Sequence, residues 1–393
     1  MFSLFGSSWV RLAAAAALLT GALAATWFLA RPSAVGPSAR AQRQVPAAPS
    51  LETRRVTETA RPSAEHRPAA PNTRLLTVLQ DTSQKPEDIQ AALEAIPSQY
   101  AARSPYKARP DAELERVLLR HAESTRASIA MAALSAARIP LMTDEPGAII
   151  TDGLVAMAAA PGDPNRRHAA LEALNLIRPN RRKPQVIAAF EAALSAQNAH
   201  LISLALFALS QSGPSLGSDA RHSSLSARVL KLSDHEDPGV RGRALAVLSE
   251  IEDFVDPATR VRTAHAHLGD DHAYVRAQAA DLVARCRDVT AIHRLIEHVS
   301  DLSLARYDLR GWSHLDGTPG VLPHSLPGRP RVADAALFSI QSLSNLVEGG
   351  VPLTLTLGGP RVSDDVVLEN AARARAWYQG AKATIPIEVS RDL

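Results

Sequence analysis

The sequence predicts an all-α fold, a solenoid of stacked helix pairs, on the strength of three observations. Alternating strand-forming runs are scarce, alanine and leucine dominate, and only 4% of the residues are aromatic, a composition typical of long helices packed through small side chains. The pair Val240-Arg241 recurs as Val275-Arg276, 35 residues later, the length of one helix-turn-helix unit. Self-similarity at such a period is the signature of a solenoid.

The recurring phrase has the order of a turn followed by a helix. Asp237-Pro238 precedes Val240-Arg241, Asp271 precedes Val275-Arg276, and a third copy runs from Asp163-Pro164 to Arg167. Proline suits the first turn of a helix because its missing N–H would have no helical partner there. The phrase therefore predicts the start of a helix in each repeat.

The chain opens with a candidate membrane segment in residues 1–30. Nineteen uncharged residues run from Leu12 to Ala30 and would span roughly 28 Å as a helix, close to the thickness of a bilayer's hydrocarbon core. Arg11 and Arg31 bracket the run. An uncleaved single-pass anchor is the favoured interpretation, with the repeat domain periplasmic or extracellular. A signal peptide cleaved after Ala22-Leu23-Ala24 and a buried soluble helix are the alternatives.

Residues 31–72 are predicted to be a disordered linker. They hold seven Pro and seven Arg but only four aliphatic residues, too little apolar surface to offset the entropy of ordering. The alternative is an arginine-rich arm that contacts anionic lipid or nucleic acid. Residues 1–74 carry a net charge of +6 and the whole chain +3, so the remainder is mildly acidic and nucleic acid is not its expected partner.

Residues 73–393 are predicted to be the helical repeat domain. Pro86 and Pro110-Asp111 open its first helices, and a partner helix carries Arg126. Helix pairs are then expected at 144–160 with 163–178, 182–196 with 198–211, 219–232 with 237–251, 256–268 with 271–287, and 288–300 with 331–348.

These units resemble HEAT repeats, in particular the short HEAT-like type of the phycobilisome lyases, in a bacterial, membrane-anchored protein. The resemblance covers about residues 75–348. It implies that the aspartates cap the second helix of each pair and that the arginines reach a neighbouring repeat's turn, forming a ladder of Asp163, Arg167, Asp237, Arg241, Asp271 and Arg276. Arg126 and Arg331 are interpreted in the same structural way. Ile202 stands where the next arginine is expected, so the ladder is broken there.

An insertion at 301–330 separates the last predicted pair. A loop this long in a compact array is usually functional or disordered. Tyr307, Trp312 and His314 are its candidate partner contacts, although they could equally pack the loop onto the last repeats.

The C-terminal cap is assigned to residues 351–393. The alternating stretch 351–360 is expected to be a short strand-like connection. A closing helix at 364–380 follows, in which Trp377 is expected to cover the open end of the core.

The sequence offers no sign of an enzyme. Its single cysteine, Cys286, is expected to be a buried, inert thiol, and His265 with His267 would lie on different faces of one helix. Phosphate-loop, dinucleotide and nucleophile-elbow motifs are missing from the sequence. We therefore expect no metal and no cofactor. The predicted function is a non-enzymatic scaffold that is tethered to the membrane and binds a protein partner through the concave face of its repeats. A lyase-like enzyme or accessory subunit is the alternative.

Overall fold

The computed structural model describes residues 73–81, 83–101, 111–161, 163–212, 221–251, 254–313, 319–325, 331–347, 350–351, 353 and 362–387. The chain separates into two units, residues 1–64 and 65–393, and every described residue belongs to the second. The expected anchor and the whole of the expected linker, residues 31–72, lie outside the described residues. Within the described part, no helix is long and apolar enough to cross a membrane.

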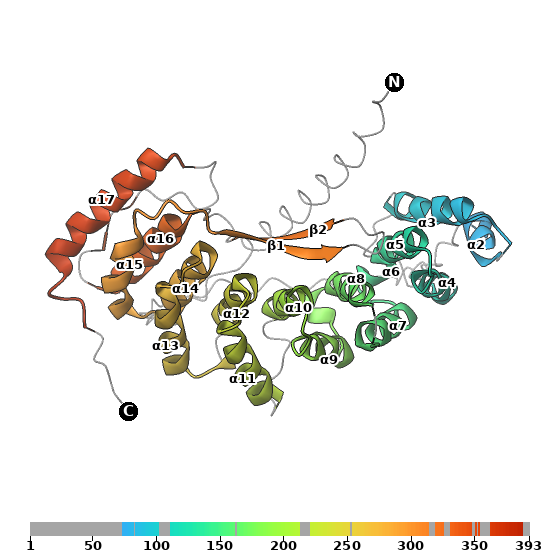
Figure 1. Ribbon diagram of the computed structural model, residues 1–393, viewed down its shortest axis with the longest axis horizontal. Helices are drawn as coiled ribbons and strands as arrows, with labels where there is room; N and C mark the ends of the chain where they lie inside the picture. The colour runs from blue at the N-terminus through green and yellow to red at the C-terminus, as the bar shows by residue number, and fades with distance from the viewer. Residues whose placement is uncertain are drawn as a thin grey trace, which may run out of the picture. The chain divides into compact units, whose positions relative to one another are not determined.

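Helices occupy most of the described chain (Figure 1). The N-terminal half contains α2 (Thr73–Gln80), α3 (Pro86–Ala101), α4 (Ala112–Ala122), α5 (Ala127–Ala136), α6 (Arg138–Leu141), α7 (Ala148–Ala159), α8 (Pro164–Asn175), the 3-10 turn η2 (Pro179–Arg181), α9 (Pro184–Ala193) and α10 (Ala199–Ser212). The C-terminal half contains α11 (Arg221–Ser233), α12 (Pro238–Glu250), α13 (Pro257–Leu268), α14 (Ala273–Arg285), the 3-10 turn η5 (Val289–Ala291), α15 (Ile292–His298), α16 (Val332–Ser344) and α17 (Asp364–Ala381). The predicted pairs are all present, with ends shifted by a few residues.

The pairs stack in chain order and form two layers. We call α4, α7, α9, α11, α13 and α15 the first helices, and their partners α5, α8, α10, α12, α14 and α16 the second helices. Each second helix packs against its own first helix and against the second helices before and after it. The second helices therefore form a continuous layer, which is the arrangement of a solenoid.

Side-chain caps explain where several helices begin. Asp163 accepts the backbone N–H of Asn165 at the start of α8, and Asp237 accepts those of Gly239 and Val240 at the start of α12. A proline follows each of these aspartates at the first helical position. An aspartate cap satisfies backbone donors that have no partner within the helix.

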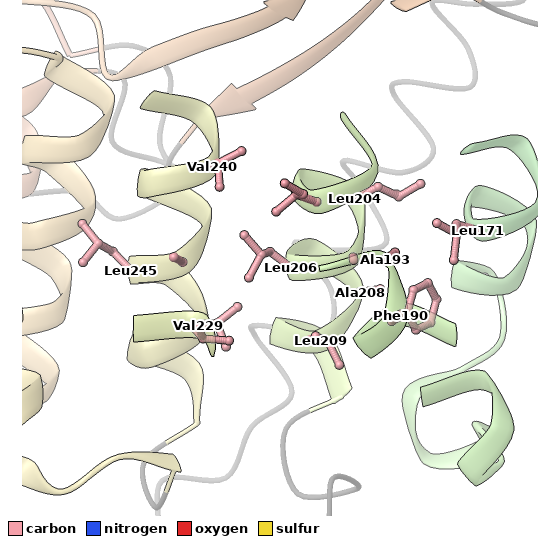
Figure 2. Packing of buried hydrophobic residues seen from close by; sticks show 14 of the residues in the cluster. Leu171, Phe190, Ala193, Leu204, Leu206, Ala208, Leu209, Val229, Val240 and Leu245 are labelled. Carbon is pink, nitrogen blue, oxygen red and sulfur yellow. The ribbon is translucent and has the colours of Figure 1, made fainter. Parts of the chain in front are cut away.

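The core lies between the two layers and continues from pair to pair. Figure 2 shows Leu204 and Leu206 of α10 between Val240 and Leu245 of α12 on one side and α9 on the other. These four side chains are at most 4% exposed. Because each pair buries its apolar stripe against the next pair, no repeat completes its core alone.

The insertion departs from the predicted all-α fold. Strands β1 (Arg306–Ser313) and β2 (Pro319–Ser325) pair antiparallel, with Tyr307 opposite His324 and an irregularity between Leu309 and Trp312. The expectation of a loop here was wrong. The two strands pair with each other locally, so the backbone groups on their facing edges are satisfied without a larger sheet.

The closing helix α17 packs against α15 and α16. Trp377 is only partly buried, whereas Tyr378 is 8% exposed. Tyr378 donates its hydroxyl to His293 Nδ1 at 2.8 Å, and Trp377 also packs against the core, so both side chains cover this end of it. Of the expected strand-like connection at 351–360, Val351 and Leu353 are described, and neither lies in a strand.

Candidate partner-binding surface

Arg241 joins two successive repeats, as the ladder prediction requires. Its Nε and Nη2 atoms donate to both carboxylate oxygens of Asp270 at 3.0 and 2.9 Å, and Nη2 also contacts Asp271 at 3.0 Å. Its Nη1 donates to the carbonyls of His235 and Glu236, both at 3.0 Å. The planar guanidinium therefore ties the turn before α12 to the turn before α14, which a lysine ammonium could not do.

Arg276 repeats this arrangement one unit later. Its Nη1 donates to the carbonyls of Asp270 and Asp271 at 2.8 and 3.0 Å, and its Nη2 to Asp301 at 2.8 Å. Burial raises the pKa of Asp301, but hydrogen bonds from Ser303 and Arg276 outweigh it and the pKa lies below its ordinary value. The ladder is thus continuous from the turn before α12 to the start of the insertion.

Asp271 does not cap α14, contrary to prediction. The cap is His272, whose Nδ1 accepts the N–H of Tyr274 at 3.2 Å, while the Asp271 side chain is 90% exposed. Counted back from the Val-Arg pair, His272 holds the position of Asp237, three residues before the valine, and Asp271 holds that of Glu236. Asp271 therefore lies one residue before the cap position, and its carboxylate binds Arg241.

The first copy of the phrase uses its arginines differently. Arg167 donates from Nε to the carbonyl of Ala158 at 3.0 Å, a bond to the first helix of its own pair. The preceding residue, Arg166, donates to the carbonyls of Glu123 and Ser124 at 3.0 and 2.9 Å, in the turn of the previous pair. The bond between repeats is therefore made by Arg166, which the Val-Arg alignment did not single out.

Arg182 substitutes for the ladder where Ile202 interrupts it. It lies before α9, is 8% exposed, and donates to Asn175 Oδ1 at 2.7 Å and Ser212 Oγ at 2.6 Å. It also donates to the carbonyls at the ends of α8 and α10. Burial lowers the pKa of Arg182 to about 10, so it stays charged at neutral pH. The link between α8 and α10 is thus made near their C-terminal ends, whereas the ladder joins the turns before the second helices.

The insertion is anchored on the ladder through Tyr307. Its hydroxyl donates to Asp237 Oδ2 at 2.9 Å, and its ring meets His272 edge-on with centroids 5.1 Å apart. A Cβ on Gly239 would lie 2.5 Å from the Tyr307 ring, so only glycine allows this contact. Burial, together with the hydrogen bond to Asp237, raises the pKa of Tyr307 to about 12.

The side chains of the other two insertion candidates are not described. The backbone of Trp312 pairs with Gly320 in the hairpin, but its side chain and the whole of His314 lie outside the described residues. Of the three predicted contacts, only Tyr307 is thus placed, and it is placed on the N-terminal ends of α12 and α14. From there the hairpin runs along the second helices in the view of Figure 1.

Several side chains of the second helices are partly exposed and are candidate partner contacts. Phe207 lies on α10, Arg243 on α12, Gln278 on α14 and Phe338 on α16, and of these only Arg243 and Gln278 hold the same position in the repeat, 35 residues apart. All are partly exposed except Gln278, which is 3% exposed. The guanidinium of Arg243 stacks 4.7 Å from the centroid of Phe207, a cation–π contact. Aromatic and arginine side chains of this kind are enriched at binding interfaces.

A second group lies two helical turns further along. Glu250 Oε1 and Asp281 Oδ2 accept from Arg285 at 2.9 and 3.0 Å, and Ser249 donates to Asp281 at 3.0 Å. We call these two groups, from Phe207 to Phe338 and from Glu250 to Arg285, the second-helix face. The face combines two phenylalanines and an arginine with an ion-paired cluster of two carboxylates and one guanidinium.

Thiol chemistry and metal binding have little support among the described residues. Cys286 is partly buried against the core, and burial raises the pKa of its thiol, which disfavours the reactive thiolate. Among the described side chains, no three or more His, Cys, Asp and Glu residues gather as metal ligands. His265 instead binds the buried Asp288.

Comparisons with known proteins agree with the fold. Neither a protein-family model nor a curated protein sequence matches this chain. Among solved structures it is similar to Kap95 in the Kap95:Nup1 complex, with 14% identity and a TM-score of 0.50 over 79% of this chain and 43% of Kap95. It is also similar to a designed armadillo repeat protein in complex with the peptide (KR)4, with 12% identity and a TM-score of 0.40 over 54% of this chain and 98% of the designed one. The structural neighbours are armadillo- and HEAT-type helical repeat proteins, and the chain shares their helical repeat architecture.

Proposed function

We propose that this protein is a non-enzymatic scaffold that binds a protein partner through the second-helix face, with the hairpin as one border of the site. The stacked pair of Arg243 and Phe207 carries the proposal, because two successive second helices there present a partly exposed arginine and a partly exposed aromatic ring in contact. A surface of successive second helices suits many modest contacts spread over several repeats.

The ladder supports this proposal because it fixes successive second helices relative to one another. Arg241 and Arg276 each bind a turn of their own repeat and an acidic side chain of the next. A surface fixed before binding loses less conformational freedom when a partner is bound. Kap95 is itself crystallised with a protein, Nup1, but fold similarity does not transfer a partner to this chain.

We further propose that residues 12–30 anchor the protein in a bacterial membrane, with residues 31–72 as a tether and the repeats on the periplasmic or extracellular side. The apolar run and the Pro- and Arg-rich stretch that follows it support this arrangement. A tether would raise the local concentration of the repeats at the membrane and so favour a partner located there.

Site-specific photo-crosslinking tests the scaffold proposal. A benzophenone amino acid replaces Phe207 or Phe338 in the full chain, and Arg120, exposed on the first helix α4, serves as the control position. One protein captured at both phenylalanine positions and not at Arg120 is the expected result. Equal capture at all three positions, or a bound chromophore with no captured protein, would favour the lyase-like alternative or a different surface.

The contribution of the hairpin is tested in the same membranes. Deleting residues 301–330 should reduce capture at Phe338 if the hairpin borders the site. Unchanged capture would limit the site to the second helices.

A further inference from the structure

A groove lies on the opposite layer, between the first helices α11 and α13. It has a volume of about 440 Å³ and is open to solvent along its length. Its walls include Lys231 and Asp234 of the α11 end and Thr259, Arg262, Thr263 and His267 of α13. The groove therefore presents two permanent cations and hydroxyl groups.

The packing of the second helices explains why the first helices stand apart. Gly242 of α12 has no side chain, so the fully buried ring of Tyr274 of α14 packs against its backbone. The contact between α11 and α13 is less extensive than that between α12 and α14. The close approach in one layer leaves space in the other, and polar side chains line this space.

Thr259 fixes the orientation of the Arg262 guanidinium in the groove. Its Nη2 donates to the hydroxyl oxygen of Thr259 at 2.7 Å, which holds the guanidinium on the groove wall and leaves several of its five N–H donors for a ligand. Arg262 and Lys231 are both exposed on that wall. An anionic oxygen between them would gain two charge-assisted hydrogen bonds.

The end of the groove near His267 is acidic. His267 lies between Asp234 and Asp270, with nitrogen–oxygen distances of 3.5 and 3.6 Å. The Asp234 side chain is 81% exposed and repels an anion placed near it. A bound anion is therefore expected nearer Arg262 and Thr263, where it competes with the exposed Asp256 for the charge of Arg262.

We propose that this groove binds an acidic segment of a protein partner, with a side-chain carboxylate held by Lys231, Arg262 and the hydroxyl of Thr263. An open groove encloses too little of a small molecule, because small-molecule sites bury most of the ligand surface. A polypeptide segment can instead extend past both ends of the groove. Leu230 and Ala266 provide apolar contacts between the polar groups of the groove. The site belongs to the first-helix layer and does not depend on the second-helix face.

Fluorescence anisotropy with the full chain tests the proposal. The probe is a fluorescein-labelled octapeptide of alternating Glu and Ala, and the same peptide with Gln in place of Glu is its neutral counterpart. At low salt the Glu peptide should bind more tightly, and K231E/R262E should weaken it by at least about tenfold, as expected when charges that contact a ligand are reversed. K231Q/R262Q, which removes the charges without reversing them, should weaken it less.

The matched control is R116E/R120E, the same change in net charge at two exposed positions of the first helix α4. It should leave binding within about twofold, because these charges lie outside the groove and are screened by salt. An octapeptide of alternating Lys and Ala should bind K231E/R262E better than it binds the unmodified chain.

Three results would overturn the proposal. The first is equal binding of the Glu and Gln peptides by the unmodified chain. The second is equal loss in K231E/R262E and R116E/R120E, which would indicate general electrostatic attraction. The third is inorganic phosphate that displaces the Glu peptide at equal concentration, which would make the groove a site for small anions.

Discussion

The hydroxyl of Tyr307 donates to Oδ2 of Asp237, whose Oδ1 caps helix α12. One carboxylate therefore fixes both the start of a second helix and the base of the hairpin. Arg241 lies one turn further along α12 and binds the next repeat. The position of the hairpin is thus set by the residues that hold two repeats together.

Replacing Tyr307 with phenylalanine should loosen the hairpin. The ring can still pack on His272, but loss of a hydrogen bond to a charged acceptor should cost about 1.5–3 kcal/mol. The measurement is hydrogen exchange of the β1 amides, which should become faster. Y378F, which removes the hydroxyl that binds His293, is the control and should leave the β1 amides unchanged.

The anchor of the hairpin should also weaken in alkali. The pKa of Tyr307 is raised from 10.0 to about 12 in the folded chain, so folding favours its neutral form. Its contribution is complete below pH 10 and is lost as the pH rises through about 12. The difference in unfolding free energy between the unmodified chain and Y307F should shrink across this range. A constant difference would contradict the raised pKa.

Removing Arg241 should destabilise the array more than removing Arg285. In the Arg241–Asp270 pair the side chains are 14% and 8% exposed, so R241A leaves a nearly buried carboxylate without its partner, at about 2–4 kcal/mol. Arg285 pairs with the partly exposed Glu250 and with Asp281, which is 8% exposed but keeps Ser249 as a donor, so R285A should cost about 1–2 kcal/mol. Urea unfolding gives both values. R241K should recover only part of the loss, because lysine cannot make the paired contacts.

Two nearby glycines should respond differently to alanine. A Cβ at Gly242 would overlap Tyr274, which is fully buried, so G242A should cost about 1–3 kcal/mol through overpacking. A Cβ at Gly239 would meet Tyr307, which is only partly buried and can move away. G239A should therefore expose the hairpin to limited proteolysis while lowering the unfolding free energy less. A larger loss of unfolding free energy in G239A than in G242A would mean that the hairpin is rigid and that the layer of second helices is not.

Arg182 should be indispensable to its repeat. R182A would leave the carbonyl of Ala208 and the hydroxyl of Ser212 without this donor, and several hydrogen bonds to a charged group would be lost at once. We expect a loss of about 3–5 kcal/mol in thermal or urea unfolding. R178A, at an exposed ion pair with Asp144, should change stability by less than about 1 kcal/mol.

Sequence reasoning located the helix pairs because their apolar periodicity and proline starts are local signals. It assigned Arg241 and Arg276 correctly, since both follow the same Val-Arg phrase. The cap of α14 was misassigned to Asp271, because Asp271 is the aspartate nearest to the Val-Arg pair, whereas the cap position three residues before the valine is held by His272, which is chemically unlike Asp237. It passed over Arg166 and Arg182, whose partners are mostly backbone carbonyls and leave no pattern in the sequence.

The sequence by itself determined that this chain is a stack of helix pairs and where most of its helices begin, because helix periodicity and caps depend on neighbours within a few residues. Only the tertiary structure decided that residues 306–313 pair with residues 319–325, that Tyr307 binds Asp237 70 residues away, and that a polar groove opens between α11 and α13. These features depend on which distant backbones approach closely. The contact of Tyr274 with Gly242 is one such approach, and it is visible only once the second helices are packed together.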